Sequence, residues 1–194
     1  MAIKSLKGGA GLKRALDNLS DKVAKKATLR VGFLEGATEP KTQLPVATIA
    51  AYQEFGATAK VEEHTQTVYR KTGKDGGFLR NGRFVKAQES NFATDHTVGA
   101  HTIVIPPRPF FRNMIAQNEG SWGGALGAAL KRSGYDAGNA LEIVGEAMVV
   151  QLQDSIRDTK DPPNAKSTVA KKGFDNPLID TGHMLNSVGK EVET

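Results

Sequence analysis

One stretch of the sequence, residues 137–158, limits the possible folds more than any other. Apolar side chains recur in it at spacings of three, four, four and four residues, which places them on one face of an α-helix. Such a face stabilises a helix only when it packs against other parts of the chain, so the core must form around it. The residues of this face are Leu141, Val144, Met148, Leu152 and Ile156.

Other segments supply partners for this helix. Residues 46–55 read as a helix that ends at Gly56, and a further helix begins at Phe110, with a small-residue continuation to residue 132. Alternating apolar residues predict strands at 28–34, 101–105 and 186–192. The sequence therefore predicts an α+β fold in which a small antiparallel sheet packs with three or four helices.

A basic helix is predicted near the start of the chain. Its apolar residues, Leu12, Leu16, Leu19 and Val23, are spaced four, three and four apart and share one stripe. Most of its lysine and arginine residues fall on the other side of the helix. This segment belongs to a basic front part of the chain, since residues 1–30 hold eight Lys or Arg and two acidic residues.

Residues 60–101 have a different character. Strand-like pieces at 65–70 and 82–86 surround a turn-rich middle with many Gly, Asp and Asn residues, and little apolar surface is present. A connection of this length is uncommon within a compact domain. We interpret residues 1–194 as a single domain in which 60–101 is an inserted β-hairpin arm or long loop.

Composition excludes several classes of protein. The chain has 194 residues, a formal charge of +5 and no Cys, which excludes disulfides, zinc–thiolate sites and cysteine nucleophiles. No apolar run approaches the roughly 18 residues that a membrane helix requires. The charge is uneven, because residues 113–194 hold eight basic and eleven acidic residues. A basic front and an acidic back suit faces that attract copies of the same chain.

We expect no catalytic residues, no cofactor and no metal site. The histidines lack the spacing of metal ligands, and no complete phosphate-loop or nucleophile-elbow motif is present. A hydrolase with Ser187, His183 and Asp180 as a triad stays as one alternative, since triads are defined by geometry. A basic DNA-binding module is another, because Arg70, Arg83 and their basic neighbours lie near aromatic side chains.

Three ordered stretches resemble the minor tail components of tailed bacteriophages, the neck or tail-completion proteins. The first is a strand from Val31 followed by VATIAAYQEFG, residues 46–56. The second is IPPRPFFR, residues 105–112, and the third is NPLIDTGHMLNSV, residues 176–188. Together the resemblance covers most of residues 28–192, and the arm looks like an insertion that some members carry.

The resemblance implies a structural virion protein without catalysis or cofactor, made in the host cytoplasm and placed in the neck or tail of the virion. It implies a homo-oligomeric ring, with a hexamer as the family-level expectation, which joins the head connector and head-closure proteins to the tail tube or tail terminator. A tail-terminator subunit remains an alternative, contact with DNA in the channel stays open, and no membrane is involved. The expected interface residues are Arg108, Arg112, Phe110, Arg70, Arg83 and Phe84.

Overall fold

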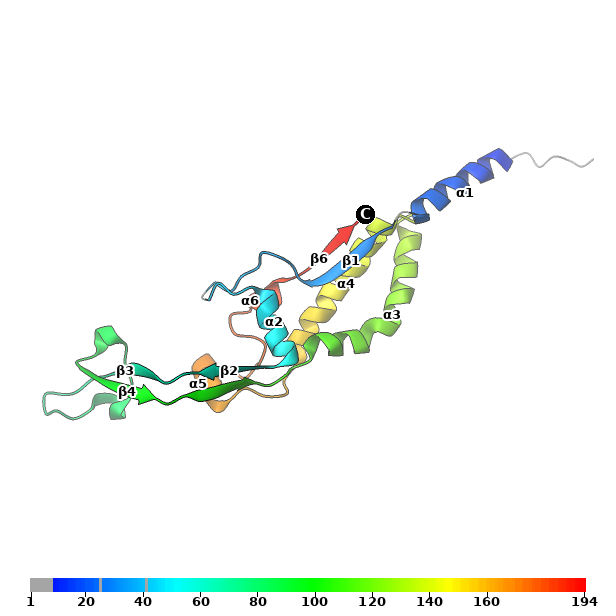
Figure 1. The fold of residues 1–194 in the computed structure, drawn as a ribbon. Coiled ribbons are helices and arrows are strands. Elements are labelled where there is room, and N and C mark those ends of the chain that lie inside the picture. The colour runs from blue at the N-terminus through cyan, green and yellow to red at the C-terminus, as the bar shows by residue number, and fades with distance from the viewer. Residues whose placement is uncertain (1–8, 25, 41) are drawn as a thin grey trace, which may run out of the picture. The chain divides into compact units, whose positions relative to one another are not determined.

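The computed structural model describes residues 9–24, 26–40 and 42–194, with the side chains of Val23 and Ala24 outside the description. The described chain is mixed α and β, as the sequence predicts, with helices and small two-stranded antiparallel sheets. It divides into two compact units (Figure 1). Unit 1 comprises residues 1–56 and 106–194, and unit 2 comprises Ala57–Ile105.

Unit 1 is built around two long helices, α3 (Phe110–Arg132) and α4 (Ala137–Asp158), which pack against each other. The strands β1 (Thr28–Phe33) and β6 (Val188–Glu193) pair antiparallel, with Phe33 opposite Val188, and both contact α4. The remaining helices of the unit are α1 (Gly9–Ala24), α2 (Val46–Phe55), α5 (Lys166–Lys172) and α6 (His183–Asn186).

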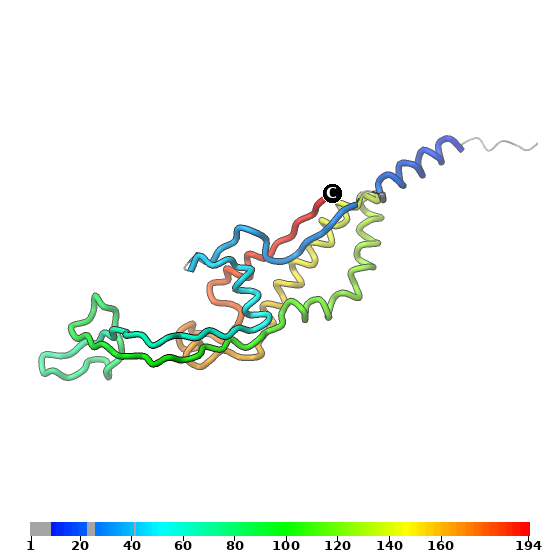
Figure 2. Tube along the Cα trace, viewed as in Figure 1, coloured from blue at the N-terminus to red at the C-terminus, as the bar shows by residue number. Residues whose placement is uncertain are grey.

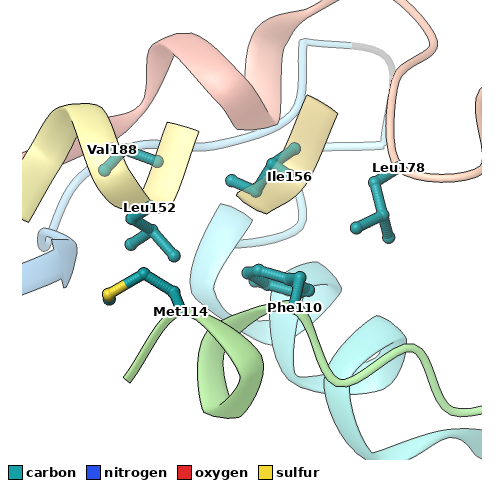
Figure 3. Close-up of a cluster of buried hydrophobic side chains, with 7 residues drawn as sticks. Phe110, Met114, Leu152, Ile156, Leu178 and Val188 are labelled. Atoms are coloured by element: carbon teal, nitrogen blue, oxygen red, sulfur yellow. The ribbon is translucent and has the colours of Figure 1, made fainter. Parts of the chain in front are cut away.

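The core of unit 1 lies where α3 and α4 meet. Phe110 and Met114 from α3 pack with Leu152 and Ile156 from α4, and Leu178 and Val188 close the cluster (Figure 3). Ala50 of α2 is also part of it. All three stretches that carry the family resemblance thus place a side chain in one core, the first through Ala50, the second through Phe110 and the third through Leu178 and Val188.

Unit 2 is a pair of two-stranded ribbons. The strands β2 (Ala57–Val61) and β5 (His101–Ile105) run side by side, and so do β3 (His64–Arg70) and β4 (Phe92–Val98) (Figure 2). Two short 3₁₀ turns, Leu79–Gly82 and Ala87–Glu89, lie in the connection between β3 and β4. The segment interpreted as an inserted arm, 60–101, falls inside this unit.

Two strand predictions need correction. Residues 101–105 do form a strand, but this strand, β5, pairs with β2 and does not join β1. The two ends of the insertion pair with each other, with Ala57 opposite Ile105. Residues 82–86 form no strand. The preceding turn holds Arg80 and Asn81 in left-handed backbone conformations, with φ of 54° and 55°, and the strand that pairs with β3 begins later, at Phe92.

Candidate interaction sites on the arm and at its base

The outer part of unit 2 carries a cluster of aromatic rings around one guanidinium. The Arg70 guanidinium carbon lies 5.3 Å from the ring centroid of Phe78 and 5.1 Å from that of Phe84. Phe78 and Phe92 meet edge to face, with centroids 5.5 Å apart. Cations at this distance are attracted by the ring face. We call Arg70, Phe78, Phe84 and Phe92 the arm-tip cluster.

Backbone and side-chain hydrogen bonds hold the loop that carries the arm-tip cluster. The side-chain oxygen of Asn91 accepts from the backbone N–H of Thr72 at 2.7 Å, and its amide donates to the carbonyl of Thr72. The Ser90 hydroxyl donates to the carbonyls of Arg70 and Phe92, both at 2.9 Å. The N–H of Val85 donates to the carbonyl of Tyr69 at 2.9 Å. Polar contacts thus give this loop its shape.

Unit 2 has no interior of its own. All of Ala57–Ile105 is described, and no residue in this range is buried. Ile103 and Val104 are successive residues of β5 and point to opposite faces of the ribbon, yet both are exposed. Phe84 is 66% exposed. Apolar side chains on both ribbon faces and at the tip are therefore open to contact with another chain.

At the base of the arm, Glu54 of α2 organises the start of α3. Its buried carboxylate accepts from the backbone N–H groups of Phe111 at 2.8 Å and Arg112 at 3.3 Å. It also accepts from the Arg112 side chain at 2.8 Å, while that guanidinium lies over the Phe55 ring. A carboxylate at a helix N-terminus satisfies free N–H groups and interacts favourably with the helix dipole. In the sequence, Glu54 is one residue of the predicted helix 46–55, and nothing nearby indicates this contact with α3.

Arg108 lies in the same region and is buried. Its guanidinium donates to the side-chain oxygen of Gln53 and to the carbonyl of Pro162, both at 2.8 Å. Its backbone N–H donates to the carbonyl of Gln53 at 2.7 Å. Burial lowers the pKa of Arg108 below its ordinary value, and the charge of Asp175 opposes this shift. Arg108 therefore ties α2, the elbow before α3 and the Pro162 loop together.

The expected interface residues fall into two groups. Arg108 and Phe110 are buried inside unit 1, where the Arg108 guanidinium donates to the chain's own carbonyl groups and Phe110 packs in the core. Contact of these two residues with a partner stays a prediction. Arg112 is exposed apart from its contacts with Glu54 and Phe55. The expected residues of unit 2 stay at the surface or partly exposed: Arg70, Arg83 and Phe84.

The residues of the alternative hydrolase site do not make the contacts of a triad. The Ser187 hydroxyl donates to the backbone carbonyl of His183 at 2.8 Å. The ring of His183 contacts the carbonyl of Thr38 at 2.8 Å through Nε2. Within the described residues, no group of three or more potential metal ligands comes together. No helix in this part of the chain is long and apolar enough to cross a membrane.

Comparisons of the chain with protein-family models, with curated proteins and with solved structures found no match.

Proposed function

We propose that this chain is a structural subunit of a tailed-bacteriophage virion, in the neck or tail-completion region. Copies assemble as a ring that joins the head connector to the tail tube. The observation that carries the proposal is unit 2, an arm with no buried residue and with exposed apolar side chains on both ribbon faces. Such a segment gains a stable environment when other subunits cover it.

The residues that resemble the phage family give the proposal its particular class. The three resembling stretches are far apart in the sequence and meet in one core. The first two also share a hydrogen-bond network through Glu54. In this proposal unit 1 is the ring body and unit 2 contacts a neighbouring ring subunit, a head-closure protein or the tail terminator. A tail-terminator role belongs to the same class, because it uses the same ring body and arm.

Shortening the arm tests the proposal. The pairing of β2 with β5 ends at Val61, which lies opposite His101. Replacing residues 62–100 with Asn-Gly therefore joins the two strands by a two-residue hairpin turn. We expect the variant to fold with an unchanged α4 core and to lose ring formation, or the joining of purified heads and tails, in negative-stain images. Substituting the exposed Glu119 on α3 provides a control that leaves the arm intact.

Two outcomes would contradict this function. Wild-type protein that forms no ring and associates with neither heads nor tails would remove the neck proposal altogether. A shortened variant that forms rings and joins heads to tails as well as the wild type would leave the ring in place and remove the arm from its mechanism.

One observation favours DNA contact as a second candidate. Residues 70–92 hold six basic and two acidic residues beside the aromatic rings of the arm-tip cluster. Cations neutralise phosphate, and binding of this kind weakens steeply as salt rises. The free wild-type chain should then bind duplex DNA at low salt, and Arg83→Ala should reduce both the affinity and its salt dependence. Negligible binding at low salt would dispose of this candidate.

A further inference from the structure

Helix α1 presents an apolar stripe that the described part of its own chain leaves exposed. Leu12 and Leu16 are 64% and 56% exposed, and Leu19 continues the stripe in a partly exposed position. Lys13 and Lys22 follow the stripe on its two sides. Val23, the fourth member expected from the sequence, lies outside the described side chains. An isolated helix of this length is marginal in water and is stabilised chiefly by packing of its apolar face.

A second open stripe lies on the outer face of α4. Ile143 and Val150 are 44% and 52% exposed, and Ala147 lies between them. The opposite face of the same helix carries Leu152 and Ile156 into the core of unit 1 (Figure 3). The outer residues are spaced four and three apart, which is also the spacing of Leu12, Leu16 and Leu19. Matching stripes with this spacing pack as a two-helix seam.

The charges beside the two stripes are complementary. Helix α4 holds four acidic residues and one basic residue, whereas α1 holds three basic and two acidic residues. Glu146 borders the outer stripe with a side chain that is 73% exposed. Lys190 contacts both Glu146, at 3.4 Å, and Glu142, so one cation is shared by two carboxylates and the face stays negative. A basic helix is therefore attracted to it.

We propose that α1 of one copy docks along the outer face of α4, Ile143–Ala147–Val150, of a second copy of this chain. Both stripes are exposed in the same chain, so neither covers the other there. Because the two surfaces differ, each copy offers one of each and the contact repeats head to tail, closing as a ring where the rotation allows. This inference rests on the proposed function, for which it supplies the contact between ring neighbours.

Cross-linking tests the contact directly, because the chain contains no Cys. Two single-cysteine variants, Leu16→Cys and Ala147→Cys, are purified separately and then mixed under mild oxidation. We expect the mixture to give a disulfide-linked heterodimer within minutes, well above the yield of either variant alone. A pair of Leu44→Cys and Ala147→Cys chains serves as a matched control, since Leu44 is an exposed apolar residue outside both stripes.

A mixing experiment tests the head-to-tail geometry. Leu12→Asp with Leu16→Asp disables the α1 surface, and Ile143→Asp with Val150→Asp disables the α4 surface. Each double variant should weaken self-association by at least about 100-fold, because two apolar anchors lose their burial. Mixed together, the two variants still contain one intact pair of surfaces. They should form dimers and nothing larger in light scattering coupled to size-exclusion chromatography. Circular dichroism checks that each variant remains folded.

The outcomes separate this contact from the neck function. If both double variants still form rings as the wild type does, the docking is overturned and the ring proposal stands. Cross-linking of Leu16→Cys chains to one another would overturn it in favour of paired α1 helices. A wild-type chain that stays monomeric at high concentration, together with a Leu16→Cys and Ala147→Cys mixture that gives no heterodimer, also overturns it. Conversely, the heterodimer cross-link in a protein that joins no heads to tails would support the docking and contradict the neck function.

Discussion

At the scale of single residues, Glu54 connects two parts of the chain that are distant in sequence. One carboxylate satisfies two backbone N–H groups at the start of α3 and contacts the Arg112 side chain. Charged hydrogen bonds of this kind are worth more than neutral ones, and a buried group that loses its partner is costly. The start of α3 is therefore fixed by α2 and not by a capping residue beside it.

Replacing Glu54 with Gln tests this role. The change keeps the size of the side chain but removes the negative charge and presents an amide to N–H donors. We expect the free energy of unfolding to fall by about 2 kcal/mol in chemical denaturation. Glu119→Gln, on the exposed surface of α3, should change it by less than about 0.5 kcal/mol. Equal effects from the two substitutions would contradict the assigned role.

Substitutions of Arg108 and Arg83 should differ in their effect on stability, because Arg108 is buried and Arg83 is exposed. Arg108→Met leaves the Gln53 side-chain oxygen and the Pro162 carbonyl without their buried donor, so we expect a loss of about 3 kcal/mol in unfolding free energy. Arg83 is exposed, and Arg83→Ala should change stability by less than about 0.5 kcal/mol. Differential scanning fluorimetry compares the two. Similar melting temperatures for both variants would show that Arg108 is not a structural residue.

The ion pair of Arg30 and Glu193 makes the stability of the β1–β6 pairing depend on pH. Its hydrogen bond and charge lower the pKa of Glu193 below the ordinary glutamate value and raise that of Arg30. A lowered carboxyl pKa adds stability that is complete above the ordinary value, about 4.3, and is lost as pH falls through the folded value. The protection of the Leu29 and Val192 amides, measured against the intrinsic exchange rate at each pH, should therefore fall below pH 4. The Glu193→Gln variant should show no such additional step.

At the scale of elements, the spacing of apolar residues predicts helices and strands only where such residues are frequent. The face of α4 predicts its bounds, and Gly56 ends α2 with φ of 78°, as expected. By contrast, β4 holds few apolar residues and is placed by pairing, including the Thr67 hydroxyl donating to Asp95 at 2.7 Å. Helix α5, with the sequence KSTVAKK, has no apolar stripe and was not predicted. Strand pairing exists only in the folded chain, and α5 has no apolar pattern, so the sequence alone predicts neither element.

The candidate sites divide in the same way. The cations and aromatics of the arm were visible as neighbours in the sequence, and the structure brings Arg70 next to Phe84. The network of Glu54 and Arg108 joins residues more than fifty positions apart, so no local pattern reveals it. For the same reason the sequence suggests Arg108, in the IPPRPFFR stretch, as an interface residue, whereas the structure buries its side chain.

One glycine in each of the two long helices, Gly124 of α3 and Gly145 of α4, should respond in opposite ways to replacement by alanine. A Cβ at Gly124 of α3 would meet no atom within 4 Å, so Gly124→Ala should raise the unfolding free energy by about 0.5–1 kcal/mol through helix propensity. A Cβ at Gly145 of α4 would lie 2.8 Å from Leu29 Cδ1 and 2.7 Å from Lys190 Cδ. Gly145→Ala should lower stability, because the side chains of Leu29 and Lys190 must shift away from these close contacts. Thermal unfolding of both variants decides.

At the scale of the whole molecule, the two units differ in how they are stabilised. Unit 1 has a buried core, whereas the fully described unit 2 has no buried residue and relies on ladder hydrogen bonds between strands. Segments with few buried contacts open locally at low free energy, well below global unfolding. In the free subunit the arm is therefore expected to open repeatedly while unit 1 stays folded.

Hydrogen exchange measured by mass spectrometry should show this difference. In the free chain, amides of residues 57–105 should exchange at least about 100-fold faster than those around Leu152 in α4, because local opening requires little apolar surface to be exposed. Ring assembly should slow exchange in the arm with little change at Leu152. The chain with residues 62–100 replaced by Asn-Gly should keep the α4 protection of the wild type. Slow exchange throughout the arm of the free monomer would contradict this description, because it would require a stabilising contact that an arm without buried residues does not supply.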